Sequence, residues 1–374
     1  MTFSVPLPLR RAVLLGLPLA VAACDLVSFV SDPKPILEQT WSIPADTASI
    51  SVAEIMPNGV NIYSSPGTTD SSAFQVTVNT VPNFSRVVGA DCPACVPLNG
   101  TTTIKPSFVI ATGTSTTMPG DVVSASLVGG QVNLSITNGL SFDPLRVKTI
   151  APASTNPSQQ GRMVIVVRSG SLVVGKDSVN GATTAFAPGA VLNRQIALTT
   201  GNISSALAVD LVLTSPASDN NVPINSNAVL SASASVPDLR VAQIRVNVVN
   251  QAMTSVVGDS IPLDGLDDGI TKHVVGGGFD MTITNPFNVS GSLSVQFGYA
   301  PGQSITKTLN ITPGPGVRQI ITLTGADTDL LFGATQKIAL SVTGSVNSPA
   351  PIDVTPKQVI TIASRLILTI RTPD

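Results

Sequence analysis

The chain has 374 residues, of which 11% are charged and 4% aromatic, and its 20 Lys and Arg face 22 Asp and Glu. No basic cluster is present, which excludes nucleic acid as a partner because such proteins neutralise phosphates with grouped cations. Ser, Thr, Asn, Gly, Val, Leu and Ile dominate, and these residues favour strands and turns over long helices. We therefore expect an all-β protein with two or three domains.

Residues 1–23 have the pattern of an export signal. Arg10 and Arg11 precede an apolar run over residues 12–23. A membrane-spanning helix needs about 20 apolar residues, and this run has roughly half as many. The segment is therefore predicted to be a cleaved signal peptide and not a permanent span.

The signal ends in Val21-Ala22-Ala23-Cys24, which resembles the lipobox of bacterial lipoproteins. The resemblance implies that Cys24 becomes the lipidated N-terminus, and acyl chains such as palmitate would then hold the protein to a membrane at about 0.8 kcal/mol per buried CH₂. The alternative is an ordinary signal peptide with an incidental cysteine. We expect residues 24–45 to form a tether on the extracytoplasmic face of the bacterial envelope, with the choice of inner or outer membrane open.

Residues 46–115 are predicted to form an N-terminal β region. It contains Cys92 and Cys95 in "DCPACVP". Prolines surround the pair, whereas a thioredoxin-like site would open a helix after a strand, and zinc would need more Cys and His ligands. A structural disulfide is therefore favoured over a redox or metal site. Whether this region is a separate domain or part of the first module remains open.

The central and C-terminal parts of the chain contain the same phrase twice: "LVGGQVNLSITNGLSF" from Leu127 and "VVGGGFDMTITNPFNV" from Val274. Apolar and polar residues alternate in the same phase, which predicts two half-buried strands. A Gly-Gly pair precedes each strand and is expected to make a turn. Asn138 and Asn285 are expected to end the strands, because asparagine readily hydrogen-bonds its own backbone.

Two further matches follow in the same order. "RQIALTTG" from Arg194 corresponds to "RQIITLTG" from Arg318 with five of eight positions identical, and similar turn-strand segments follow near Pro223 and Pro351. The order indicates a duplicated module, which predicts tandem antiparallel β-sandwiches of Greek-key type over residues 116–250 and 251–374. In the RQI strands the apolar phase differs by one residue, which would turn corresponding side chains to opposite faces.

The stretch "TITNPFNVSGSLSVQF" in the second copy resembles the late-embryogenesis-abundant type-2 and water-stress (WHy) modules. The resemblance implies seven-stranded β-sandwiches, found on bacterial lipoproteins and in plant desiccation proteins, with no catalytic residues to carry over. The first copy departs from the pattern, since "GLSFDP" follows Asn138.

Residues with catalytic or ligand chemistry are few. His273 is the single histidine, and no Gly-x-Ser-x-Gly motif accompanies it, so a surface or strand-end position is favoured over a hydrolytic triad. Asp264, Asp267 and Asp268 could offer oxygen ligands to calcium, but their spacing departs from the known calcium loop, and a solvated turn is the preferred interpretation. No catalytic residue, metal site or cofactor is predicted.

These features favour a non-enzymatic, lipid-anchored envelope lipoprotein with a structural or binding role, whose partners are the membrane and an unidentified protein or apolar ligand. The mean hydropathy of +0.37 motivates an alternative, a carrier of lipid or another apolar ligand with a hollow core. A secreted hydrolase is a third and less favoured hypothesis.

Overall fold

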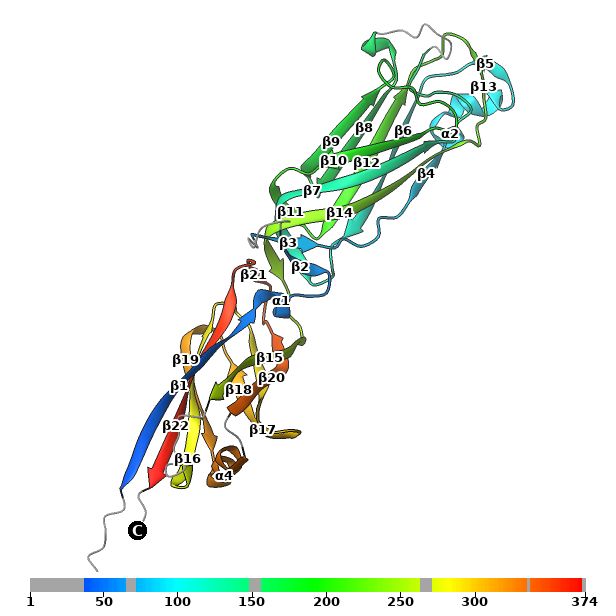
Figure 1. Ribbon diagram of the computed structural model, residues 1–374. Helices are drawn as coiled ribbons and strands as arrows, with labels where there is room; N and C mark the ends of the chain where they lie inside the picture. Colours follow the sequence, from blue (N-terminus) through cyan, green and yellow to red (C-terminus); the bar gives the residue numbers. More distant parts are fainter. Residues whose placement is uncertain (1–36, 65–71, 148–155, 263–270, 335–336, 372–374) are drawn as a thin grey trace, which may run out of the picture.

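The computed structural model describes residues 37–64, 72–147, 156–262, 271–334 and 337–371. Two elongated lobes lie end to end (Figure 1). Lobe 1 contains residues 52–246 and lobe 2 contains residues 38–51 together with 251–371. Both are built from antiparallel sheets, so the protein is all-β, as the composition predicts.

Lobe 1 is a sandwich of a large and a small sheet, with a two-stranded sheet at its outer end. In the large sheet, strands pair in the order β10-β7-β14-β3-β2, and β11 and β4 pair with β7 and β14. These strands are β2 (Val60–Tyr63), β3 (Ala73–Val76), β4 (Phe84–Val87), β7 (Val122–Asn138), β10 (Val191–Ala197), β11 (Gly201–Ser204) and β14 (Val229–Val246). The small sheet has the order β6-β12-β8-β9, from β6 (Phe108–Thr117), β8 (Arg162–Ser169), β9 (Leu172–Asn180) and β12 (Ala206–Ser215). The two-stranded sheet joins β5 (Thr102–Ile104) and β13 (Asn221–Pro223).

Lobe 2 is a sandwich of two four-stranded sheets. One has the order β1-β22-β16-β19, from β1 (Glu38–Ser51), β16 (Val274–Asn285), β19 (Gly314–Leu323) and β22 (Val359–Arg371). The other has the order β15-β20-β17-β18, from β15 (Gln251–Pro262), β17 (Ser290–Ala300), β18 (Gln303–Ile311) and β20 (Lys337–Asn347). β21 (Ile352–Val354) pairs with the end of β14 and thereby links the lobes.

Helices are short and lie at the ends of the sandwiches (Figure 1). Those for which the structure describes every residue are α1 (Val52–Ile55), α2 (Val88–Asp91), η1 (Pro93–Leu98), η2 (Pro157–Gln159) and α4 (Gly325–Ala334). The sequence favours strands because β-branched residues recur at every second position, where each can bury a side chain on a pleated surface.

The two lobes repeat one topology. The order β6-β12-β8-β9 corresponds to β15-β20-β17-β18, and β10-β7-β14 corresponds to β19-β16-β22. Seven strands of lobe 1 thus have counterparts in lobe 2. β13 and β21 also occupy the same place in the chain order, but β13 pairs with β5 and β21 with β14. The repeated phrases occupy equivalent central strands, β7 and β16, and the boundary expected between the modules coincides with the start of β15 at Gln251.

The one-residue shift in the RQI strands is also visible in the strand pairing. Arg194 pairs with Leu134, whereas Arg318 pairs with Thr282, one position farther along the repeated phrase. In consequence Ile196 is 2% exposed and Ile320 is 57% exposed, so the corresponding isoleucines point to opposite faces.

The N-terminal boundaries differ from the sequence expectation. β1 starts at Glu38, so the last part of the expected tether is a strand, and it pairs with β22 from the opposite end of the chain. Residues 60–115 contribute β2 to β5 and most of β6 to lobe 1. The expected N-terminal region is therefore divided between the lobes, because the exposed edges of β22 and β14 each accept a strand from it.

The expected Gly-Gly turns are also corrected. Both pairs lie inside long strands, β7 and β16. A Cβ at Gly130 would lie 2.5 Å from the Asp238 carbonyl oxygen, and one at Gly277 would lie 2.5 Å from that of Ile367. The glycines therefore permit close approach of a neighbouring strand, which is the other common use of glycine in a strand.

Inward-facing side chains of the sheets pack against each other in both lobes. In lobe 2, Phe279 of β16 stacks on Phe297 of β17, with ring centroids 4.4 Å apart and both side chains fully buried. β22 lies between β1 and β16. The stacked rings show close packing between the two sheets of lobe 2 at this point.

Candidate functional site

The asparagines that end β7 and β16 organise equivalent loops. The side-chain amide of Asn138 donates to the carbonyl oxygens of Phe142 (3.0 Å) and Phe186 (2.6 Å), and its oxygen accepts from the Leu140 N–H (2.9 Å). Asn138 is 0% exposed. One side chain thus ties the end of β7 to the loop before β10.

Asn285 repeats this arrangement in lobe 2. It donates to the carbonyl oxygens of Val289 (2.9 Å) and Thr312 (3.2 Å) and accepts from the Phe287 N–H (3.0 Å). The strand-ending role expected for both asparagines is confirmed, and the two copies of the sequence repeat share the same pattern of hydrogen bonds. This asparagine latch is a property of the fold, because it occurs in both lobes.

Lobe 1 has a buried lysine close to the loop that Asn138 holds. Lys105, just after β5, is 0% exposed. Its Nζ donates to Ser215 Oγ (2.7 Å) and to the Pro216 carbonyl oxygen, and it lies 5.4 Å from the ring centroids of both Phe108 and Phe142. The ammonium group is thus held between two hydrogen-bond acceptors and two aromatic rings.

Burial lowers the pKa of Lys105 from 10.5 to about 8, because the surroundings disfavour the charged form, and the nearby Asp143 opposes part of this effect. A lysine with such a pKa beside a serine hydroxyl resembles a Ser-Lys nucleophile pair in chemical terms. Ser215 is 1% exposed, however, so no substrate can reach its hydroxyl in this conformation. Here the pair connects the end of β12 to the segment after β5.

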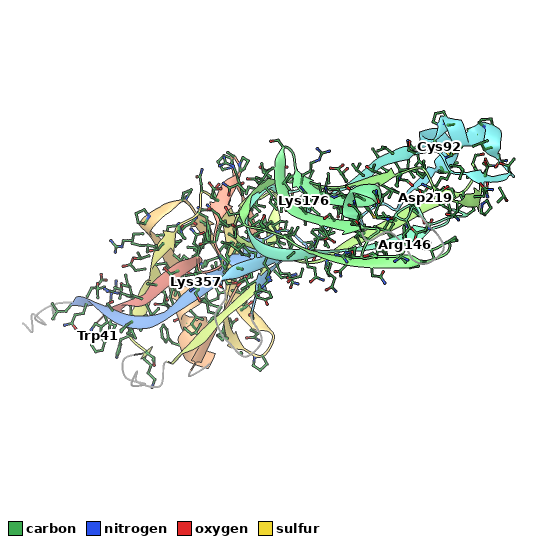
Figure 2. All side chains as sticks on the ribbon, turned by 90° about the horizontal axis from the view of Figure 1, so that it is seen from above. Trp41, Cys92, Arg146, Lys176, Asp219 and Lys357 are labelled. Atoms are coloured by element: carbon green, nitrogen blue, oxygen red, sulfur yellow. A yellow bond between two sulfur atoms is a disulfide. The ribbon has the colours of Figure 1, made fainter. Side chains whose placement is uncertain are left out.

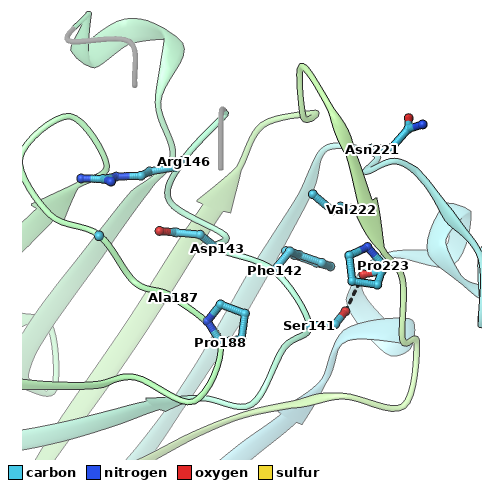
Figure 3. Close-up of a pocket in the computed structure, with 10 residues that line it drawn as sticks. Ser141, Phe142, Asp143, Arg146, Ala187, Pro188, Asn221, Val222 and Pro223 are labelled. Atoms are coloured by element: carbon cyan, nitrogen blue, oxygen red, sulfur yellow. Dashed lines mark hydrogen bonds between the residues drawn. The ribbon is translucent and has the colours of Figure 1, made fainter. Parts of the chain in front are cut away.

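A pocket of about 270 Å³ opens beside this network (Figure 3). Apolar walls come from Phe142, Ala187, Pro188, Val222 and Pro223, while Asp143 and Arg146 lie together on one side. The pocket is formed between the loop after β7, the loop before β10, and β13.

Hydrogen bonds fix the two loops that form this pocket. Asp143 accepts from the backbone N–H groups of Leu145 and Phe186, at 2.8 Å each, and Ser141 donates to the Pro223 carbonyl oxygen (2.6 Å). Because the walls are tied to one another, the pocket is preformed and suited to a small apolar group with a polar end.

The disulfide lies at the same end of lobe 1. Cys92 and Cys95 are joined and buried, between α2 and η1. Figure 2 places Cys92 and Arg146 at one end of the molecule and Trp41 of β1 at the other. We call the end that holds the pocket and the disulfide the tip.

The other candidate residues do not meet at the tip. His273 lies directly before β16 in lobe 2, at a strand end as expected, and its carbonyl oxygen accepts from the Arg371 N–H (2.9 Å). Cys24 and the calcium candidates Asp264, Asp267 and Asp268 lie outside the described residues. Within the described ranges, no group of three or more His, Cys, Asp or Glu side chains could hold a metal ion, and no helix is long and apolar enough to span a membrane.

Sequence reasoning missed Lys105 and the pocket. The available signal was a lysine in "TIKPSFV", where it precedes an alternating strand in a chain with few charges. The pocket itself joins segments around residues 142, 187 and 222, so no local motif could indicate it.

Fold and site together define an all-β protein of tandem sandwiches with a pocketed tip. No protein-family model and no curated relative matches the chain. Among solved structures, a protein from Parabacteroides distasonis described as secreted has 10% identity and a TM-score of 0.30, over 90% of this chain and 100% of its own. The infectious bursal disease virus structure has 10% identity and a TM-score of 0.19, over 83% of this chain and 74% of its own. At these TM-scores neither similarity bears on function.

Proposed function

We propose that the protein is a lipid-anchored, non-enzymatic lipoprotein of the bacterial envelope that presents the tip of lobe 1 for binding. The observation that supports this most directly is the position at which the described chain enters the fold. β1 begins at Glu38, fourteen residues after Cys24, and Glu38 pairs with Arg371 at the outer end of lobe 2. The pocket lies at the opposite end of the molecule (Figures 1 and 2).

This arrangement suits a stalk. Acyl chains on Cys24 would hold the outer end of lobe 2 near the membrane, and the end-to-end lobes would project the tip away from it. The strand pairing between β1 and β22 supports this role, because twelve paired positions along the sheet fix the first strand firmly in lobe 2. The N-terminal signal pattern and the lipobox resemblance favour an extracytoplasmic location.

Replacement of the anchoring cysteine tests the proposal. Cys24→Ala is expected to abolish incorporation of radiolabelled palmitate and to move the protein from the membrane fraction to the soluble fraction. The matched control is the Cys92→Ser/Cys95→Ser variant, which should remain in the membrane fraction. Unchanged membrane fractionation of Cys24→Ala would contradict the lipid anchor.

A second measurement tests the orientation. A fluorophore on a cysteine placed at Thr40, which is exposed on β1, should be quenched by quencher-bearing lipids when the lipidated protein is reconstituted in vesicles. The same fluorophore at Asn221, exposed at the tip, should not be quenched. Equal quenching at both positions would show that the molecule lies flat on the bilayer and does not project from it.

A further inference from the structure

The outer face of the small sheet in lobe 1 combines apolar and cationic side chains. This face, which we call the β6–β9 face, consists of the side chains of β6, β12, β8 and β9 that point away from the sandwich. Strand pairing arranges them in four rows, from β6 to β9: Val109, Thr214, Arg162, Asn180; Ala111, Val212, Val164, Ser178; Gly113, Asp210, Val166, Lys176; Ser115, Ala208, Arg168, Val173.

Apolar side chains occupy the middle of the β6–β9 face. Val212 lies between Ala111 and Val164 on the neighbouring strands, and Val109 and Val166 adjoin them. Val109 is 50% exposed and Val212 39% exposed, so water contacts a contiguous group of β-branched side chains. A shallow groove on this face is lined by Ala111, Thr112, Val166, Arg168, Asp210 and Val212. Grouped exposed apolar residues of this kind indicate an interaction surface, whereas isolated ones do not.

Cations flank these valines on the β8 and β9 side of the face. Arg168 pairs with Asp210 at 2.6 Å, and Arg162 and Lys176 have no ion-pair partner among the described residues. The face thus carries three cations and one carboxylate, although the chain as a whole has a net charge of −2. An apolar centre bordered by polar and charged side chains is the usual anatomy of a protein-binding surface.

The equivalent face of lobe 2 has a different composition. On three of its strands the described outward positions are small or polar and carry no charge: Ser292, Ser294, Gln296 and Gly298 on β17, Ala339, Ser341, Thr343 and Ser345 on β20, and Ser304, Thr306, Thr308 and Asn310 on β18. The shared topology therefore does not require valines or cations at this face. The valines and cations on β12, β8 and β9, the counterparts of β20, β17 and β18, therefore point to a role outside folding.

We propose that the β6–β9 face binds an acidic protein partner whose contact surface combines carboxylates with apolar side chains. Charge excludes a second copy bound through the same face, because three cations of one copy would meet three of the other. The proposal is independent of the lipid anchor and of the pocket at the tip.

The size of the face sets the strength of the contact. Four strands roughly 4.8 Å apart and four rows roughly 6.8 Å apart give an area of about 500 Å², below the roughly 800 Å² that each partner contributes to a stable complex. The association is therefore weak and reversible, and the peptide probe below should bind in the micromolar range or more weakly.

Binding of a defined peptide to the full mature protein tests the proposal. The probe is a fluorescent twelve-residue peptide of alternating glutamate and valine, followed by anisotropy, and the comparison peptide alternates lysine and valine. Arg162→Glu with Lys176→Glu is expected to weaken binding of the acidic peptide by about tenfold or more. Val164→Thr with Val212→Thr keeps the β-branched shape and should weaken it by about tenfold through loss of apolar contact.

The matched control reverses two exposed lysines of lobe 2, Lys272→Glu with Lys357→Glu, and changes the net charge by the same amount. It should bind the acidic peptide within about twofold of the parent, and circular dichroism melts should show that every variant is folded. Three results would overturn the proposal: no saturable binding of the acidic peptide, equal binding of the lysine peptide, or a loss of binding in the lobe 2 control as large as in the charge variant. Phosphatidylglycerol vesicles that bind the parent and not the charge variant, while the acidic peptide fails to bind, would assign the face to a lipid surface instead.

Discussion

Replacement of Asn285 by alanine tests whether the repeated asparagine latch stabilises its lobe. The variant removes two hydrogen bonds that the amide donates to the carbonyl oxygens of Val289 and Thr312, and one that it accepts from Phe287. Asn285 is 2% exposed, so water has little access to the groups left behind. The loss therefore exceeds the net value of three ordinary hydrogen bonds.

Each buried polar group without a partner costs about 1–3 kcal/mol. Water entering the space left by the amide should recover part of this cost, so we expect lobe 2 to lose about 4 kcal/mol of its free energy of unfolding. With a urea dependence of about 2 kcal/mol per molar, the unfolding midpoint of lobe 2 should fall by about 2 M. Asn285→Asp should lower the free energy of unfolding by at least as much, because a carboxylate oxygen would face the two carbonyl oxygens.

Urea titration followed by circular dichroism and by peptide-level hydrogen exchange measures the effect and locates it. Exchange should accelerate in peptides of lobe 2, and Asn138→Ala should produce the same pattern in lobe 1. The control is Asn288→Ala, an exposed position three residues away, where a change within about 0.5 kcal/mol is expected. If Asn285→Ala and Asn288→Ala had equal midpoints, the latch would have no energetic role.

Two further predictions concern lobe 1. For Lys105, the unfolded chain holds its proton up to a pKa of 10.5 and the folded protein only up to about 8, so stability rises with pH between these values, by up to about 3 kcal/mol. Lys105→Met should remove this rise in stability. Urea titrations of the parent and the variant at several pH values across that range measure it, and equal pH dependence of the two free energies of unfolding would refute the prediction. Cys92→Ser with Cys95→Ser should lower the stability of lobe 1 by about 2 kcal/mol, as estimated from the short closed loop. Thermal melts of the variant should then coincide with those of the parent under reducing conditions.

Local pattern was sufficient to predict the fold class and the repeat. Period-two alternation has one physical cause, the pleat of a half-buried strand, so it identified β7 and β16 and their endings at Asn138 and Asn285. The phase of the RQI strands even indicated that Ile196 and Ile320 would face opposite ways. These features depend on residues close together in the chain.

Features that depend on distant segments could not be derived in this way. The pairing of β1 with β22 joins residues more than three hundred positions apart. The residues of an edge strand do not specify which strand it will pair with. Gly130 and Gly277 show the same limit, since a glycine that makes a turn and one that admits a neighbouring strand look alike in sequence. Lys105 was missed because burial of a lysine depends on acceptors at Ser215 and Pro216, which lie on another strand segment.

The duplication separates what the fold requires from what one lobe adds. Both lobes keep the order of seven strands and the asparagine latch, so these features belong to the scaffold. The latch in lobe 2 involves Phe287 and Thr312, while in lobe 1 the corresponding loops also hold Asp143 and border the tip pocket. The valines and cations on β12, β8 and β9 likewise have small or polar, uncharged residues at the described outward positions of β20, β17 and β18. Since three strands of lobe 2 have the same order with serine and threonine at most of these positions, the valines and cations of lobe 1 are the feature on which the proposed binding role of the β6–β9 face rests.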